Sequence, residues 1–162
     1  MLDIIQAFRQ NHALEHATIH VLSRGNPQIK MVGRTTASGF VIYGPLDTQQ
    51  VANAASEAIA RLQQGEAHLA VHPRCGTNLA VTGLLCGTAA FASTLGRPRS
   101  KLDRLPIAVA AATLAALAAQ PLAAMVQESV TTTSDVYNVA ISDVTRIERG
   151  TLVMHKVYLE RE

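Results

Sequence analysis

The sequence contains few charged and few aromatic side chains. Of its 162 residues only 16% are charged and 4% aromatic, there is no tryptophan, and 48% are hydrophobic. The net charge of +2 is too small to indicate nucleic-acid binding, and no basic run follows one helical face. This aliphatic, alanine-rich composition is typical either of membrane spans or of a helix-rich core.

Cysteine is scarce, and the N-terminus lacks the features of a cleavable signal peptide. Cys75 and Cys86 are the two cysteines of the chain. On one helix their side chains would be about 16 Å apart, too far for a disulfide, so both are predicted to be thiols. Residues 1–6 have no basic segment followed by an apolar core and a cleavage site, so no signal peptide is expected.

Charge is absent from two long runs, residues 77–96 and 105–127. A helix of twenty residues rises about 30 Å, the thickness of the hydrocarbon layer. The connector 97–104 carries four Lys/Arg residues, which places it in the cytoplasm by the positive-inside rule. These runs predict a two-helix transmembrane hairpin, a multi-pass location and the lipid bilayer as a partner.

A soluble alternative explains part of the same pattern. The second run is mostly alanine and contains Thr113, Gln120 and Pro121, so a buried helical pair would look similar. The first run has leucines all round the helix and no polar face, which favours lipid. Gly83 and Gly87, four residues apart, are typical of helices that pack closely in membranes.

The polar flanks predict an α+β domain. Apolar periodicity predicts helices, β-prone runs predict strands, and Asp47 with Gln50 predicts a capping box. The expected order is a helix at 2–24, a β-hairpin at 29–34 and 40–43, a helix at 48–63, a strand at 68–71 and a C-terminal β-hairpin at 137–147 and 152–159. The chain then comprises an N-terminal segment 1–76, the transmembrane hairpin 77–127 and a C-terminal segment 128–162 that completes the polar domain.

The first helix carries a candidate metal site, His12-Ala13-Leu14-Glu15-His16. Side chains four residues apart leave a helix on the same face, so His12 and His16 can bind one metal ion. Glu15 borders that face and could poise a metal-bound water or act as a third ligand. The order matches the inverted zincin pattern H-x-x-E-H, although two exposed histidines beside a glutamate on an amphipathic helix give the same pattern.

A second cluster, His72-Pro73-Arg74-Cys75-Gly76-Thr77, precedes the first apolar run. His72 and Cys75, with two residues between them, have a common ligand spacing, and a thiolate is a strong soft ligand. In the alternative interpretation Pro73 and Gly76 mark the helix entry, Arg74 is an interfacial anchor, Cys75 is a small buried residue and Thr77 is the cap.

The other histidines and one glutamate are expected to have structural roles. His20 extends the row of His12 and His16 and is interpreted as a partly buried residue at the edge of the core. His68 and His155 are interpreted as polar residues of the surface or sheet. Glu57 could be a carboxylate ligand of the kind that inverted zincins take from a later helix, but it is interpreted as part of a solvated helix face.

The two clusters together resemble the YqhQ-like family of bacterial membrane proteins, whose members carry a His-x-x-Glu-His-x-Thr-Ile run and a later His-Pro-Arg-Cys-Gly-Thr run. The matching residues here are His12, Glu15, His16, Thr18 and Ile19, and residues 72–77. The resemblance covers about a fifth of the chain, and this chain has fewer apolar spans than those relatives. It implies a paired metal site in a membrane protein and no particular substrate.

Three hypotheses follow from these residues. In a zinc-dependent membrane hydrolase or peptidase, His12, His16 and Cys75 or His72 bind zinc, and Glu15 is the general base. Arg74 would then stabilise negative charge that develops on the substrate.

In the second hypothesis His12, His16, His72 and Cys75 saturate a structural ion in a noncatalytic membrane subunit, which would act with a membrane-complex partner or as a homo-oligomer. In the third hypothesis the chain is a metal-free scaffold, and the same residues form a buried polar network.

Overall fold

The computed structural model describes residues 2–95 and 100–161. The chain divides into two compact units, one formed by Met1–His72 with Glu128–Glu162 and the other by Pro73–Gln127. The first unit is a mixed α+β fold and the second consists of helices. The α+β class expected from the sequence is therefore confirmed.

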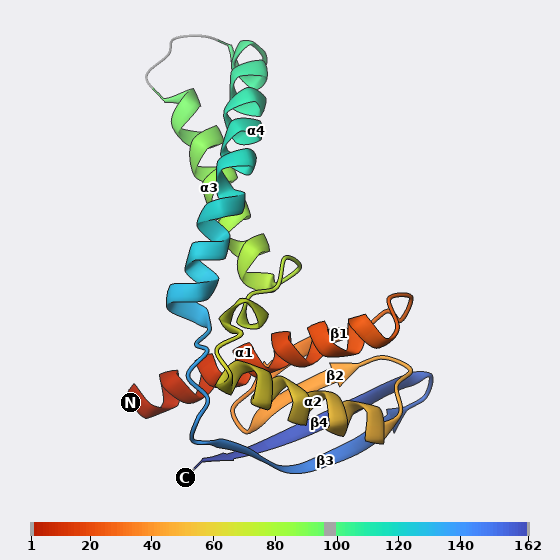
Figure 1. Cartoon of the computed structure of the whole chain (residues 1–162). Helices are drawn as coiled ribbons and strands as arrows, with labels where there is room; N and C mark the ends of the chain where they lie inside the picture. Colours follow the sequence, from red (N-terminus) through yellow and green to blue (C-terminus); the bar gives the residue numbers. More distant parts are fainter. Residues whose placement is uncertain (1, 96–99, 162) are drawn as a thin grey trace. The chain divides into compact units, whose positions relative to one another are not determined.

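The first unit contains two long helices and a four-stranded antiparallel sheet with the order β1-β2-β4-β3 (Figure 1). Its elements are α1 (Leu2–Gly25), β1 (Val32–Thr36), β2 (Gly39–Tyr43), α2 (Thr48–Gln63), the 3-10 helix η1 (Ala67–Ala70), β3 (Val139–Arg149) and β4 (Leu152–Arg161). Because β2 pairs with β4, the N-terminal and C-terminal hairpins form one sheet.

Local signals explain the ends of several elements. The side chain of Asp47 accepts hydrogen bonds from the backbone amides of Gln49 and Gln50. The Gln50 side-chain oxygen accepts one from the Asp47 backbone amide, so the expected capping box starts α2. Gly39 has a φ of 141°, and a Cβ there would lie 2.1 Å from the Val157 carbonyl oxygen. Residues 37–38 alone join β1 and β2, so this turn is tighter than the five-residue loop expected from the sequence.

Helices α1 and α2 lie side by side on the sheet, with α1 over β1 and β2 and α2 over β3 and β4 (Figure 1). Alanines on both helices allow this close approach, because they fill little space between the two axes. The buried core residues come from both helices and from the central strands: Leu14, Ala17, Phe40, Ile42, Val51, Ala55, Ala58, Leu62, Val157 and Leu159.

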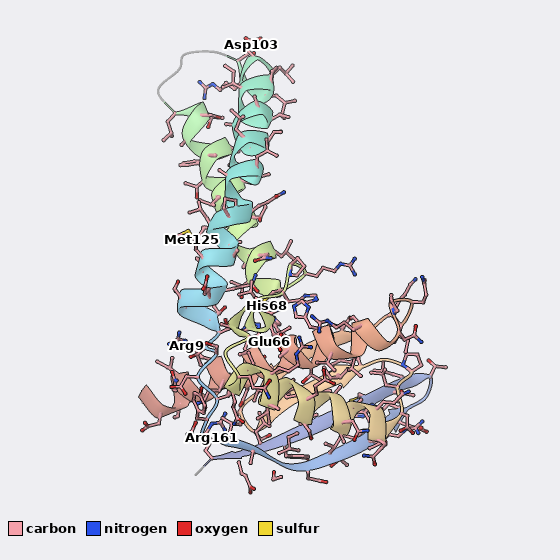
Figure 2. The ribbon with its side chains drawn as sticks, viewed as in Figure 1. Arg9, Glu66, His68, Asp103, Met125 and Arg161 are labelled. Atoms are coloured by element: carbon pink, nitrogen blue, oxygen red, sulfur yellow. The ribbon has the colours of Figure 1, made fainter. Side chains whose placement is uncertain are left out.

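Arg161 attaches the start of α1 to the end of β4. Its guanidinium donates to the Gln10 side chain (2.9 Å) and to the carbonyl oxygen of Ala7 (3.0 Å), and it also bonds to the Asn11 side chain. Figure 2 labels Arg161 at the C-terminal end of the sheet. Partial burial lowers the pKa of Arg161, and these acceptors compensate the loss of water around its charge.

The strand predicted at 68–71 is wrong. Residues 67–70 form η1, and the carbonyl groups of Ala70 and Val71 accept hydrogen bonds from side chains of α1 instead of from a neighbouring strand. Gly65, with a φ of 92°, lies in the turn that follows α2 and leads directly into η1. The local β-type composition was outweighed by these long-range acceptor contacts.

The second unit contains α3 (Gly76–Thr94) and α4 (Lys101–Val126), which pack against each other (Figure 1). One helix of the described residues, Leu102–Thr131, is long and apolar enough to cross a membrane. The prediction of membrane spans is therefore supported for one helix only, and the expected two-helix transmembrane hairpin and multi-pass location are not supported. Helix α3 begins with Gly76-Thr77-Asn78 and contains further threonines, which lower its apolar character.

Within residues 73–95 and 100–127 of the second unit, a Cβ at Gly83 or Gly87 would meet nothing within 4 Å, so this pair makes no close contact with α4. Both cysteines are thiols, as predicted, and Cys86 Sγ lies 3.3 Å from the Ala112 carbonyl oxygen. The basic connector was the basis for the cytoplasmic assignment, and its residues 97–99 lie outside the described residues.

His155 lies on β4 opposite Ile42 and is fully buried, which agrees with its assignment to the sheet and excludes the surface. Its Nε2 lies 3.2 Å from the Thr48 hydroxyl, and its Nδ1 has no hydrogen-bond partner within the described part of the chain. Desolvation, together with the charge of Arg146, lowers the pKa of His155. The folded state therefore holds this imidazole neutral where an exposed histidine is protonated.

We expect His155 to weaken the fold in mild acid. Because its pKa is lower in the folded state, the unfolded chain takes up a proton first, and stability falls as the pH drops below about 6.5. His155→Gln removes this proton uptake, so its free energy of unfolding should change less between about pH 8 and pH 5 than that of the wild type. Denaturant unfolding in detergent measures both curves, and exposed His68→Gln is the matched control. Identical pH slopes for wild type and His155→Gln would contradict the prediction.

Candidate metal centre

Helix α1 presents a row of histidines on one face of the first unit. His12, His16 and His20 are spaced four residues apart, so their side chains leave the helix one turn above another. The ring centroids of His12 and His16 are 4.3 Å apart. Gly25 ends the helix, and no glycine or proline interrupts it before that residue. The spacing of His12 and His16 predicted from the sequence is confirmed.

Main-chain carbonyl groups orient these imidazoles. His16 Nδ1 lies 2.7 Å from the Ala70 carbonyl oxygen, and His12 Nδ1 lies 3.0 Å from that of Thr131. A carbonyl oxygen only accepts hydrogen bonds, so each Nδ1 carries the proton and donates it. In the neutral imidazole the Nε2 atoms of His12 and His16 then carry the lone pairs.

His72 extends the row from a different segment of the chain. Its ring centroid lies 5.7 Å from that of His16 and 5.0 Å from that of His20. His20 Nε2 lies 3.0 Å from the Val71 carbonyl oxygen and donates to it, so the lone pair of His20 is on Nδ1. The structure therefore gathers four imidazoles, including that of His20, which is partly buried as expected.

This arrangement has the chemistry of a metal site. Histidines that bind a metal usually donate their other ring N–H to a carboxylate, a carbonyl or water, which fixes the tautomer and the ring orientation. His12 and His16 both have such a partner on the main chain. His16 is buried and His12 partly exposed, so an ion held there would be shielded on one side only.

Arg9 supports the segment that orients His12. Its Nη2 donates to the carbonyl oxygens of Ser129 (3.1 Å) and Thr132 (2.9 Å), and its Nε donates to Thr132 again (3.1 Å). Figure 2 labels Arg9 on the N-terminal part of α1. These bonds hold residues 129–132 in place, so the carbonyl group of Thr131 reaches His12. Sequence reasoning missed Arg9, because nothing in its local context marks these distant partners.

Glu15 contacts the sheet. Its Oε2 accepts a hydrogen bond of 2.5 Å from the Thr35 hydroxyl on β1, and the residue is buried. A Cβ on Gly33 would lie 2.3 Å from Glu15 Oε1, so glycine at this strand position makes room for the carboxylate. The structure thus gives Glu15 a role in packing α1 onto β1, whatever its role toward a metal.

Arg74 and Cys75 belong to the second unit, which begins at Pro73. Cys75 is the N-cap of α3, where its sulfur accepts from the Thr77 amide at 3.4 Å. The Asn78 side chain donates to the Pro73 carbonyl oxygen at 2.9 Å. The motif therefore begins α3, as the helix-entry interpretation expects, but the cap is Cys75 and not Thr77.

The remaining candidates have the structural roles expected of them. The His68 side chain is 66% exposed and lies 3.9 Å from Glu66. Glu57 is 54% exposed and pairs with Arg61, as a residue of a solvated helix face does. Arg61 also donates to Glu66, and this hydrogen bond lowers the pKa of Glu66. These groups form a surface ion-pair network on α2 and the turn after it.

Comparison with known proteins shows the family. The chain belongs to the DUF6391 family, described as a domain of unknown function, which matches residues 7–144. It is also similar to an uncharacterized protein of Picosynechococcus sp., with 36% identity over 146 residues that cover 84% of this chain and 70% of the relative. No solved structure matches the chain. The comparisons thus give this family, and not the YqhQ-like family that the two motifs resemble.

We expect Gly33→Ala to destabilise the first unit by about 1–3 kcal/mol, because the new methyl group overlaps the Glu15 carboxylate. Denaturant unfolding in detergent measures this change. Gly25→Ala is the control, since a Cβ there would meet nothing within 4 Å. Combining Gly33→Ala with Glu15→Ala should cost less than the sum of the single changes. Additive effects would show that the two positions do not interact.

Proposed function

We propose that this chain is a membrane-anchored protein that binds a transition-metal ion through His12, His16 and Cys75, with His72 as an alternative ligand. The observation that carries the proposal is the pair of carbonyl contacts that fix His12 and His16 in the tautomer a metal ligand needs. If His12 and His16 only filled a buried polar site and bound no metal, their lone pairs could lie on different ring nitrogens.

The sulfur ligand is supported by the distance along the chain. Cys75 follows His72 by three residues, a length that spans at most about 11 Å when fully extended. Since the His72 ring lies near those of His16 and His20, Cys75 is tethered in the same region. Two imidazoles and a thiolate are a donor set that zinc prefers, and zinc is the ion we propose.

The membrane anchor is supported by the surface of the second unit. Most leucines of α3 and α4 point outward, including Leu79 (78% exposed) and Leu114 (68% exposed). In water such an apolar surface would favour aggregation, whereas lipid acyl chains can surround it without an unfavourable free energy of hydration. We infer that α4 crosses the bilayer and that α3 lies along it in the same lipid environment.

In a catalytic form of this protein, Glu15 and Arg74 would have roles in hydrolysis. With three protein ligands, zinc keeps a position for water, and a metal-bound water is a nucleophile near neutral pH. Glu15 would act as general base and Arg74 would stabilise the developing oxyanion of a hydrolase or peptidase. In the noncatalytic form His72 is the fourth ligand and saturates the ion.

Protein purified in detergent should carry zinc, and the double variant His12→Ala/His16→Ala should lose it. Removing an outer partner of a ligand costs roughly 10–100-fold in metal affinity, so removing two ligands should cost more. Elemental analysis and competition with a chelator measure the loss. His68→Ala, which removes an exposed histidine, is the matched control. Equal metal content in all three proteins would refute the proposed site.

Cobalt substitution tests the sulfur ligand separately. A Co²⁺ ion bound to a thiolate shows an intense near-ultraviolet charge-transfer band, which Cys75→Ser should abolish while Cys86→Ser preserves it. If the band is absent from the wild type, Cys75 is not a ligand. His72→Ala should then reduce cobalt binding in its place.

Glu15→Gln separates the roles of the carboxylate. The amide oxygen can still accept from Thr35, so the variant should fold and retain its metal if Glu15 is a base or only packs α1. Loss of metal as complete as in the double histidine variant would identify Glu15 as a ligand. The same metal analysis measures both outcomes.

A further inference from the structure

The first turns of α1 expose apolar side chains. Ile4 is 63% exposed, Ile5 54% and Phe8 42%, and none of them belongs to the buried core of the first unit. The side chains that face the core begin further along the helix, at Ala13 and Leu14. An apolar cluster at the end of a helix that is otherwise well packed is typical of a surface that meets another apolar phase.

The contacts of Arg9 tie this end of α1 to the segment that follows α4. Arg9 bonds to the carbonyl groups of Ser129 and Thr132, and Phe8 is its neighbour in the helix. The apolar helix continues without a break from Leu102 to Thr131. Its last turn, η2 (Gln127–Thr131), contains Gln127, Glu128 and Ser129, which is the polar composition expected where a span leaves the hydrocarbon layer.

We propose that Ile4, Ile5 and Phe8, together with Val130, form an N-terminal apolar patch that inserts into the boundary between lipid headgroups and acyl chains. Val130 is 60% exposed and lies in the segment that Arg9 holds. This inference rests on the proposed membrane span, because the span keeps residues 127–131 at the bilayer surface. Arg9 fixes the start of α1 at the same level, so lipid is the occupant, in the manner of an interfacial helix.

The absence of tryptophan from the chain allows a direct test. Full-length Phe8→Trp is reconstituted into phosphatidylcholine vesicles with bromine atoms near the head of the acyl chains. Its emission should shift to shorter wavelength and lose intensity relative to vesicles of unbrominated lipid. Ile5→Trp repeats the measurement at a second exposed position, in case the first variant folds poorly.

Two further single-tryptophan variants serve as controls. Leu114→Trp in α4 should be quenched most by bromine deep in the acyl chains, and Val32→Trp should not be quenched. Val32 is 66% exposed but lies on β1, four residues before Thr36, whose carbonyl group accepts from Asn11 in the middle of α1. Val32 is therefore more exposed than Phe8, at 66% against 42%, while it lies away from the N-terminal patch.

The outcomes separate the two proposals. Quenching of Leu114→Trp without quenching at positions 5 and 8 would overturn the interfacial patch and leave the span in place. Absence of quenching at Leu114→Trp would overturn the span itself. Blue-shifted emission at position 8 without quenching would mean that protein, such as a second copy of this chain, covers the patch. Equal quenching at positions 8 and 32 would mean that contact with lipid is not specific to the patch, which also overturns it.

Discussion

Hydrogen bonds from the polar edge of α1 to main-chain carbonyl groups are the constraint on which the rest of the first unit depends. Arg9 and the three histidines of this helix donate to carbonyl oxygens of residues 70–71 and 129–132. Neither segment belongs to the sheet, so these side-chain donors, and not a neighbouring strand, hold the two segments against α1. The same bonds orient the imidazoles. Folding and site geometry are thus achieved by one set of contacts.

Elements with a strong local signal could be predicted from the sequence. The capping box of Asp47 and Gln50 and the apolar periodicity of residues 48–63 gave the bounds of α2, and the C-terminal hairpin turns at Gly150, which has a φ of 62°. The prediction of a strand at 68–71 is wrong because the β-type composition of these residues does not determine where their carbonyl groups find hydrogen-bond donors. The donors to these carbonyl groups are His16 and His20, which lie more than fifty residues earlier in the chain.

The candidate site could be predicted only as far as spacing within a helix allows. The separation of four residues between His12 and His16 places both rings on one face wherever the helix lies. Their carbonyl partners are 119 and 54 residues away, and no pattern in the sequence links them. Glu15 shows the same limit, since its sequence motif indicates catalysis, while the contact with Thr35 and the space beside Gly33 depend on tertiary packing.

Thr131 belongs to the proposed membrane span and also contacts a residue of the proposed metal site. This residue ends the continuous apolar helix from Leu102, and its carbonyl oxygen accepts the Nδ1–H of His12. Any displacement of that helix end within the first unit must stretch the His12 contact and the Arg9 contacts with Ser129 and Thr132. An ion bound to His12 would resist the same displacement. Because coupling between two binding events is reciprocal, the lipid around the helix and the ion at the histidines would then influence each other through this single turn.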